Sequence, residues 1–383
     1  MSSVIQRFLA RRDFLRLGLG STAGLAGAAM IGQAVVGQQE TLHTVDAMTG
    51  DAHEHGRMML VGEVDHERNG FDPMQILVDW DYGEVSQLEN GQMLREYEIV
   101  AVDQEVEIAP GIFFPAWTYN GRVPGPTIRC TEGDRIRINF INAGTHPHTI
   151  HFHGIHRSEM DGVPGAGPGM IGVGESFVYE FDAEPFGCHL YHCHAIPLTR
   201  HIHKGLYGAF IVDPKAGRPP AREFVIVMNA FDTNFDGENE IYAANTVGHE
   251  YMRRPIPALV DELIRIYLIN ITEFDPINSF HLHAEFFDYY DHGTTLEPSL
   301  RTVDTIMQCQ AQRGILEFKY RWPGKYMFHA HQSEFAELGW MSNLNIVTPE
   351  NLPAALAEIG VDATWDEKAR NGSTVAMKAE VKA

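Results

Sequence analysis

The sequence predicts an all-β fold made of two consecutive strand-rich domains. Residues 97–102 and 134–140 approach or show the alternation of polar and apolar side chains that is typical of strands. The chain contains 36 Gly and 20 Pro, as expected where turns join many short strands. Four His-x-His pairs, two in each half of the chain, indicate that the second half is a divergent repeat of the first.

Length and charge narrow the class of protein. A chain of 383 residues, of which 44% are hydrophobic, is long enough for two domains with terminal extensions. Its formal net charge of -22 argues against nucleic acid or an anionic membrane surface as a partner.

The N-terminus has the pattern of a secretion signal. Arg11 and Arg12 precede an apolar stretch, rich in Gly and Ala, over residues 17–31, and the small residue Ala34 follows it. This stretch is too short and too rich in glycine for a membrane span. We expect residues 1–34 to be a twin-arginine signal peptide. The processed protein is then periplasmic or extracellular and has no membrane anchor.

Changes in composition divide the rest of the chain. Polar residues 35–94 form an N-terminal arm, and strand patterns mark a first domain over residues 95–213. A linker, residues 214–222, contains Pro and Gly and leads to a second domain over residues 223–348. Residues 349–383 form a C-terminal tail, which we expect to be helical over residues 352–359 and mobile beyond them.

The paired histidines point to a metal centre. Side chains two residues apart on a strand share a face, so each pair offers two ligands to one cluster. Imidazole is a good ligand for copper, zinc, iron or nickel. The first domain carries the pairs His151/His153 and His192/His194, and the second carries His281/His283 and His329/His331.

Cys193 identifies the metal. It lies between His192 and His194, so on a strand it faces the opposite side and can belong to a separate site. A blue-copper site needs two histidines, one cysteine and a weak or absent axial ligand. His148 lies on the face opposite the His151/His153 pair, and His201 follows Cys193 by eight residues.

The predicted type 1 copper ligands are therefore His148, Cys193 and His201, with His146 and His203 as the nearby alternatives. Leu206 takes the axial position. It either raises the redox potential of the site, because it donates nothing to copper, or is ordinary core packing.

These motifs over residues 95–348 resemble the copper signature of multicopper oxidases. The short chain is similar to two-domain laccases and to copper nitrite reductases, which implies two cupredoxin-like Greek-key β-sandwich domains. The type 1 ligands are missing from the second domain, where the corresponding residues are Asn278, Ala330, Phe335 and, at the axial position, Trp340.

The resemblance implies four copper ions per chain: one type 1, one type 2 and two type 3. His151 and His281 would bind the type 2 copper. The type 3 pair would be bound by His153, His192, His194, His283, His329 and His331. A small reducing substrate, a phenolic or aromatic compound or a metal ion, would give electrons singly to the type 1 copper. They would pass along the Cys193 backbone and reduce O2 to water.

The resemblance also implies an assembly and a proton donor. Two-domain relatives complete each trinuclear cluster between the first domain of one chain and the second domain of the next, in a homotrimer. Multicopper oxidases often place a proton-relay acid in the loop that holds Asp161 here. The alternative is that Asp161 is only a turn residue before Gly162.

Two other functions compete with an oxidase. Copper nitrite reductases have an aspartate where His151 stands, and the full set of eight histidines argues against them. The third hypothesis is a non-catalytic copper-binding protein. The reductant is not identified by the sequence, and neither is any disulfide pairing of Cys130, Cys188 and Cys309. His53, His55, Met58 and Met59 of the arm either bind extra copper or belong to a solvated segment.

Overall fold

The computed structural model describes residues 59–378 of the chain. The predicted signal peptide lies outside the described residues, as do His53, His55 and Met58 of the arm. The described part forms one compact unit that starts at Met59. No helix in the described part is both long enough and apolar enough to span a membrane.

The first domain is a sandwich of two sheets. One sheet has the strand order β1-β5-β10-β9-β7, and the other has β2-β3-β6-β8 with β4 paired to β3. The strands are β1 (Trp80–Asp81), β2 (Glu84–Gln87), β3 (Met93–Ala109), β4 (Ile112–Tyr119), β5 (Thr127–Thr131), β6 (Arg135–Asn142), β7 (His151–Phe152), β8 (Ser176–Asp182), β9 (Gly187–His192) and β10 (Tyr207–Asp213).

Alternation along β6 explains how this domain forms its core. Ile136, Ile138 and Phe140 are buried, while the residues between them are partly or fully exposed. The buried face packs against Ile128 and Phe210 of the opposite sheet. Strands β1 and β2 precede residue 95, so part of the segment predicted as an arm contributes edge strands to this domain.

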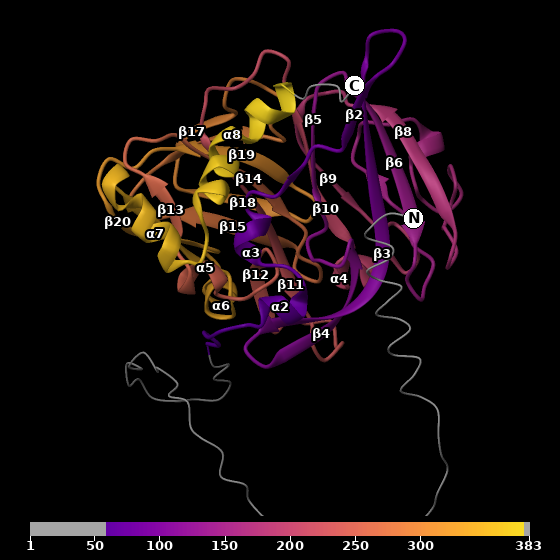
Figure 1. Cartoon of the computed structure of the whole chain (residues 1–383). Coiled ribbons are helices and arrows are strands. Elements are labelled where there is room, and N and C mark those ends of the chain that lie inside the picture. The colour runs from indigo at the N-terminus through magenta and orange to yellow at the C-terminus, as the bar shows by residue number, and fades with distance from the viewer. Residues whose placement is uncertain (1–58, 379–383) are drawn as a thin grey trace, which may run out of the picture. The chain divides into compact units, whose positions relative to one another are not determined.

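The second domain repeats this plan. Its sheets have the orders β12-β11-β14-β19-β16-β17 and β13-β21-β20-β15-β18. The strands are β11 (Arg222–Phe231), β12 (Ile241–Ala244), β13 (Ile256–Leu259), β14 (Ile264–Asn270), β15 (Ile277–Leu282), β16 (Phe287–Asp291), β17 (Leu300–Val303), β18 (Thr305–Cys309), β19 (Arg313–Phe318), β20 (Gly324–His329) and β21 (Met341–Val347). Figure 1 shows these orange strands beside the magenta strands of the first domain.

Short helices connect or flank the sheets. They are α2 (His66–Asn69), α3 (Pro73–Ile76), η1 (Ser158–Met160), α4 (Leu198–His203), α5 (Glu250–Arg253), α6 (Ser333–Glu337), η2 (Pro349–Asn351), α7 (Leu352–Glu358) and α8 (Ala363–Lys378). A further apolar core joins the domains, where Val106 and Leu190 of the first pack with Val225 and Ile269 of the second. The prediction of an all-β fold with two cupredoxin-like sandwiches is confirmed.

The C-terminal tail differs from the prediction. Instead of becoming mobile after residue 359, the chain forms α8, which lies against the body of the protein (Figure 1). Trp365 is buried, and its indole N–H donates to the carbonyl of Met74 over 2.7 Å. Ala369, one turn later, is also buried, so one apolar stripe anchors an otherwise charged helix. Composition alone concealed this stripe because it is narrow.

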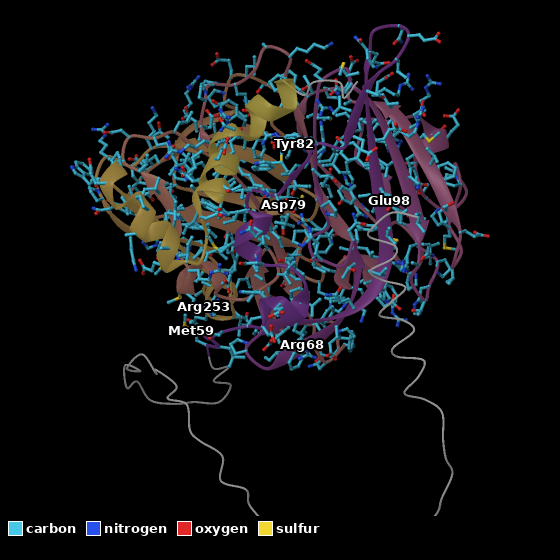
Figure 2. The ribbon with its side chains drawn as sticks, viewed as in Figure 1. Met59, Arg68, Asp79, Tyr82, Glu98 and Arg253 are labelled. Carbon is cyan, nitrogen blue, oxygen red and sulfur yellow. The ribbon has the colours of Figure 1, made fainter. Side chains whose placement is uncertain are left out.

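The same helix is tied to the segment before β2. The hydroxyl of Tyr82 donates to the carbonyl of Gly372 over 2.8 Å, and Lys368 lies 3.8 Å from Asp79. Figure 2 labels Tyr82 and Asp79 beside α8. The two ends of the described chain therefore support each other.

Replacing Trp365 with alanine should lower the free energy of unfolding by about 3–5 kcal/mol, because it opens a cavity and leaves a buried carbonyl without its donor. Urea unfolding measures this change. Trp322 is 69% exposed, and its replacement by alanine is the matched control, with a change within about 0.5 kcal/mol. A change within about 0.5 kcal/mol for Trp365→Ala as well would show that the burial of Trp365 adds no stability.

Candidate metal centre

His148, Cys193 and His201 meet in the interior of the first domain. The Cys193 sulfur lies 3.2 Å from His201 Nδ1 and 4.0 Å from His148 Nδ1, and the two nitrogens are 3.2 Å apart. All three residues are buried. His201 comes from the short helix α4. The structure thus brings together the three predicted type 1 ligands.

The two alternative histidines have other partners. His203 Nε2 accepts a hydrogen bond from the backbone N–H of Asp232, and its ring contacts Phe235 and Phe274. His146 packs on Trp117, with ring centroids 4.5 Å apart, toward the surface. Leu206 is fully buried, and its carbonyl accepts the N–H of Cys193 over 2.9 Å.

The electrostatics of this site suit a metal. Burial lowers the pKa of His148 to about 3 and that of His201 to about 4, so both rings are neutral and able to ligate at ordinary pH. Burial also raises the pKa of the Cys193 thiol to about 11. Binding of a metal at this sulfur must therefore displace a proton. Two imidazoles and one sulfur are the donors that copper accepts in an electron-transfer site.

The paired histidines of the first domain form a second group, separate from His148, Cys193 and His201. His153 Nε2 and His192 Nε2 are 3.0 Å apart, and the His151 ring lies 5.1 Å from that of His194. His151 Nδ1 faces Asp161, 2.9 Å from its carbonyl and 3.0 Å from a carboxylate oxygen. These bonds leave the opposite nitrogen, Nε2, for a metal and fix the ring, as partners behind metal ligands do.

The second set has the same internal geometry. His283 Nε2 and His329 Nε2 are 2.9 Å apart, and the His281 ring lies 5.0 Å from that of His331. His281 Nδ1 is held by the Thr305 hydroxyl at 2.8 Å and by the carbonyl of Asp304 at 3.0 Å. The structure therefore contains two similar half-sites, each with four histidines.

Backbone hydrogen bonds identify the positions of the second domain that correspond to the predicted type 1 positions of the first. Ala330 N–H donates to Trp340 as Cys193 N–H donates to Leu206, and Trp340 N–H donates to Phe335 as Leu206 N–H donates to His201. Trp340 is fully buried and packs on Phe280 and Phe328. The indole occupies the interior at the position that corresponds to Leu206, and no thiol or imidazole is left at these positions.

The two half-sites are separate within one chain. Across residues 59–378, every ring contact between paired histidines joins members of the same half-site. His283 and His331 of the second half-site are exposed, whereas His192 of the first is buried. A cluster with all eight histidines would therefore require that a first half-site and a second half-site be brought together.

Cys193 connects the type 1 donors to the first half-site. β9 ends at His192, yet the side chains of residues 192–194 still alternate as predicted. Cys193 points to His148 and His201, while His192 and His194 point to His151. The Thr149 hydroxyl accepts the His194 N–H over 2.9 Å, and this bond holds the segment in place. Ser279 does the same for His331.

Sequence reasoning missed two residues of the site. His156 Nε2 lies 3.6 Å from the Asp161 carboxylate, and His156 also lines a cavity of about 840 Å³ with Met160, Glu180 and Phe181. Trp117 contacts both type 1 histidines through its ring. The position of His156 in the sequence, three residues after His153, was a weak signal of a role in the site, and the position of Trp117 gave no signal.

All four cysteines lie in the described part of the chain, and none forms a disulfide.

Comparison with known proteins agrees with this geometry. Two family models, both described as multicopper oxidase, match residues 103–217 and 218–350. The chain belongs to the multicopper oxidase family, which implies a copper cofactor and an oxidoreductase activity. The donor sets described above fit copper.

The individual relatives are described with more than one activity. A solved structure described as a multicopper oxidase is 58% identical, with a TM-score of 0.73, and covers 74% of this chain and 100% of its own. The blue copper oxidase of Nitrosomonas europaea is 27% identical, with a TM-score of 0.59, and covers 66% of this chain and 86% of its own.

The copper-containing nitrite reductase of Neisseria meningitidis serogroup A is 30% identical over 252 residues, or 60% of this chain. The alignment spans 63% of that relative's length, less than two thirds.

Proposed function

We propose that this protein is a laccase-like oxidase. It couples the one-electron oxidation of a small reducing substrate to the four-electron reduction of O2 to water. One observation carries the proposal: Cys193 joins a buried Cys and His donor set to a half-site made only of histidines. His151, rather than a carboxylate, stands in that half-site, and this distinguishes the chain from the nitrite reductases it resembles.

Different residues would bind the different copper ions. His148, Cys193 and His201 would hold the type 1 copper. His151 and His281 would hold type 2, and the other six paired histidines would hold type 3, giving four ions per chain. When bound, copper supplies single-electron transfer at the first site and reduction of O2 at the others. The backbone of residues 192–194 provides a covalent connection between the two donor sets.

We infer that the half-sites of different chains complete each other in a homotrimer. The second half-site is open to its surroundings, which supports this assembly. Met307, 64% exposed, lies on β18 opposite Ser279, next to the pair formed by His281 and Thr305. An exposed apolar side chain beside an unfinished ligand set is expected where another protein surface packs. Export by the twin-arginine route remains part of the proposal.

Metal content and gas consumption test this function. The copper-loaded protein should contain four copper ions per chain and consume O2 with a reducing dye, while nitrite under argon should not be reduced. Two copper ions per chain with reduction of nitrite would support a nitrite reductase instead. Full copper content with no activity toward any reductant would support a non-catalytic copper-binding protein.

Asp161 is proposed as the proton relay of O2 reduction. Its carboxylate lies 3.0 Å from His151 Nδ1 and 3.6 Å from His156, which borders the surface cavity. Asp161→Asn should lower turnover by roughly 100-fold or more, because the amide cannot carry a proton. Type 1 colour should be retained. The control is Glu159→Gln, a neighbouring exposed carboxylate, with little change. Equal turnover of the two variants would leave Asp161 as a turn residue.

A further inference from the structure

His203 is a buried histidine that the proposed oxidase function does not use. It is 4% exposed and lies two residues after His201 in the same short helix, α4. The two side chains leave this helix in different directions. His201 Nδ1 lies 3.2 Å from the Cys193 sulfur, whereas His203 Nε2 accepts the backbone N–H of Asp232 over 3.0 Å. Helix α4 therefore connects a predicted type 1 ligand to the second domain.

Helix α4 holds His201 only loosely through its own hydrogen bonds. It has six residues, and no side chain caps its N-terminus. The N–H of His201 lies 3.4 Å from the carbonyl of Pro197, and the carbonyl of His201 lies 3.4 Å from the N–H of Leu206. Both distances exceed the usual N–H···O distance of about 2.9 Å, and helices this short are marginal by themselves. The position of His201 therefore depends on contacts that anchor the helix from outside.

His203 makes such contacts among aromatic rings. Its ring centroid lies 5.1 Å from that of Phe274 and 5.8 Å from that of Phe235, both in the second domain. The ring of Phe114, in β4, lies 5.2 Å from it on the side of the first domain. A buried N–H is costly to leave without an acceptor, so the hydrogen bond from Asp232 resists displacement of the His203 ring.

The loop that receives His203 is itself braced. It connects β11 to β12, and the Asp232 carboxylate accepts two backbone N–H groups of the same loop over 2.8 and 3.1 Å. Asn239 Nδ2 donates to the carbonyl of Glu273 over 2.7 Å, and Glu273 precedes Phe274 in the sequence. His203 is thus fixed against a stiff part of the second domain.

We propose that His203 is a positioning residue of the type 1 site, which ties α4 to the second domain and so fixes His201 relative to Cys193. This inference rests on the proposed function, because it concerns the site at which that activity would take up electrons. The second domain has no thiol at the position of Cys193, yet through His203 it determines the geometry of the site in the first. Thiolate and thioether ligands select Cu(I), so weakening the imidazole ligand His201 favours Cu(I) and raises the reduction potential.

Two substitutions of His203 separate the hydrogen bond from the ring. His203→Phe keeps an aromatic ring but removes the acceptor for the Asp232 N–H, whereas His203→Gln offers an amide oxygen near the position of Nε2. In the copper-loaded protein under argon, the equilibrium constant for reduction of the type 1 site by a one-electron dye is measured. It should rise about three- to tenfold in His203→Phe, which is about 30–60 mV for a one-electron couple.

Loss of the blue colour to a copper chelator is the second measurement. Its rate should also rise about three- to tenfold in His203→Phe, less than the roughly 10- to 100-fold expected for a residue that contacts a metal ligand directly. His203→Gln should return both the potential and this rate close to the wild-type values, because it restores the acceptor. These measurements need only the type 1 copper. The inference can therefore hold when no O2 is consumed, and it can fail while O2 is consumed.

His249→Phe is the control for the general cost of replacing a buried histidine. His249 lies in the second domain, is 2% exposed, and donates from Nε2 to the carbonyl of Glu337 over 3.2 Å. Its replacement should lower the midpoint temperature of unfolding and leave the potential and the colour of the type 1 site unchanged. If His203→Phe does not fold, Phe274→Leu decides. Phe274 is 38% exposed, and loss of its ring should raise the potential by a smaller amount.

Two outcomes would overturn the inference. One is a wild-type potential and a wild-type rate of colour loss in both His203→Phe and Phe274→Leu. Helix α4 would then be held by the first domain alone, where the Trp117 N–H donates to the carbonyl of Lys204 over 2.8 Å. The other is an equal change in His203→Phe and His203→Gln, since the acceptor would then have no part in holding the helix.

Discussion

Replacing Cys193 with serine should abolish both the blue colour and the oxidation of substrate. The Cys193 sulfur is the one thiol in contact with His148 and His201 within residues 59–378, and a hydroxyl does not replace a thiolate as a copper ligand. The loss of turnover should exceed the roughly 10- to 100-fold that follows removal of a hydrogen-bond partner behind a metal ligand. Absorbance and O2 consumption measure the two effects, and copper content should fall by about one ion per chain.

Cys309→Ser is the control for this experiment. Cys309 is an exposed cysteine on β18, remote in sequence from the type 1 donors, and its loss should leave colour and turnover unchanged. Persistent blue colour in Cys193→Ser would show that another group binds the copper. Loss of colour with full turnover would mean that electrons reach the histidine cluster without Cys193.

Mixed assemblies should recover activity that neither parent variant has. A chain with His151→Ala and His153→Ala lacks its first half-site, and a chain with His281→Ala and His283→Ala lacks its second. Each variant alone should reduce no O2. If clusters form between chains, an equal mixture should recover about one quarter of wild-type activity, because half of each kind of half-site is intact and pairing is random.

This recovery requires that the variants are produced together, so that they assemble together. The same two proteins, purified separately and mixed without unfolding, are the control and should stay inactive. Sedimentation should show three chains per particle for each variant. No recovery in co-assembled trimers would mean that both half-sites of a cluster come from one chain.

The donor residues could be predicted because the information is local. Strand periodicity alone separates Cys193 from His192 and His194, and the spacing of His148 from His151 assigns it to the other face. The absence of a thiol and an imidazole from the corresponding positions of the second domain was also readable, from Ala330 and Phe335. Hydrogen bonds from Ala330 to Trp340 and from Cys193 to Leu206 show the equivalence in the structure.

Other features depend on contacts between distant segments. The tail was predicted to be mobile because Trp365 is one apolar residue in a charged stretch, yet it is buried against Met74 from the other end of the chain. Trp117 carries no signal of function in its own sequence context. It becomes part of the site only because β4 brings it against His148 and His201.

The sequence by itself determined the fold class and the donor atoms, because alternation along a strand and the identity of metal-ligating side chains are local properties. The tertiary structure decided which donors meet. It brought Cys193 together with His148 and His201, bonded His203 to Asp232, and placed Asp161 against His151. Within residues 59–378 it also kept the ring contacts of the two histidine half-sites separate. The physical reason is that ligand geometry depends on how the strands and loops of each sandwich pack together, and this packing is not encoded in residue spacing.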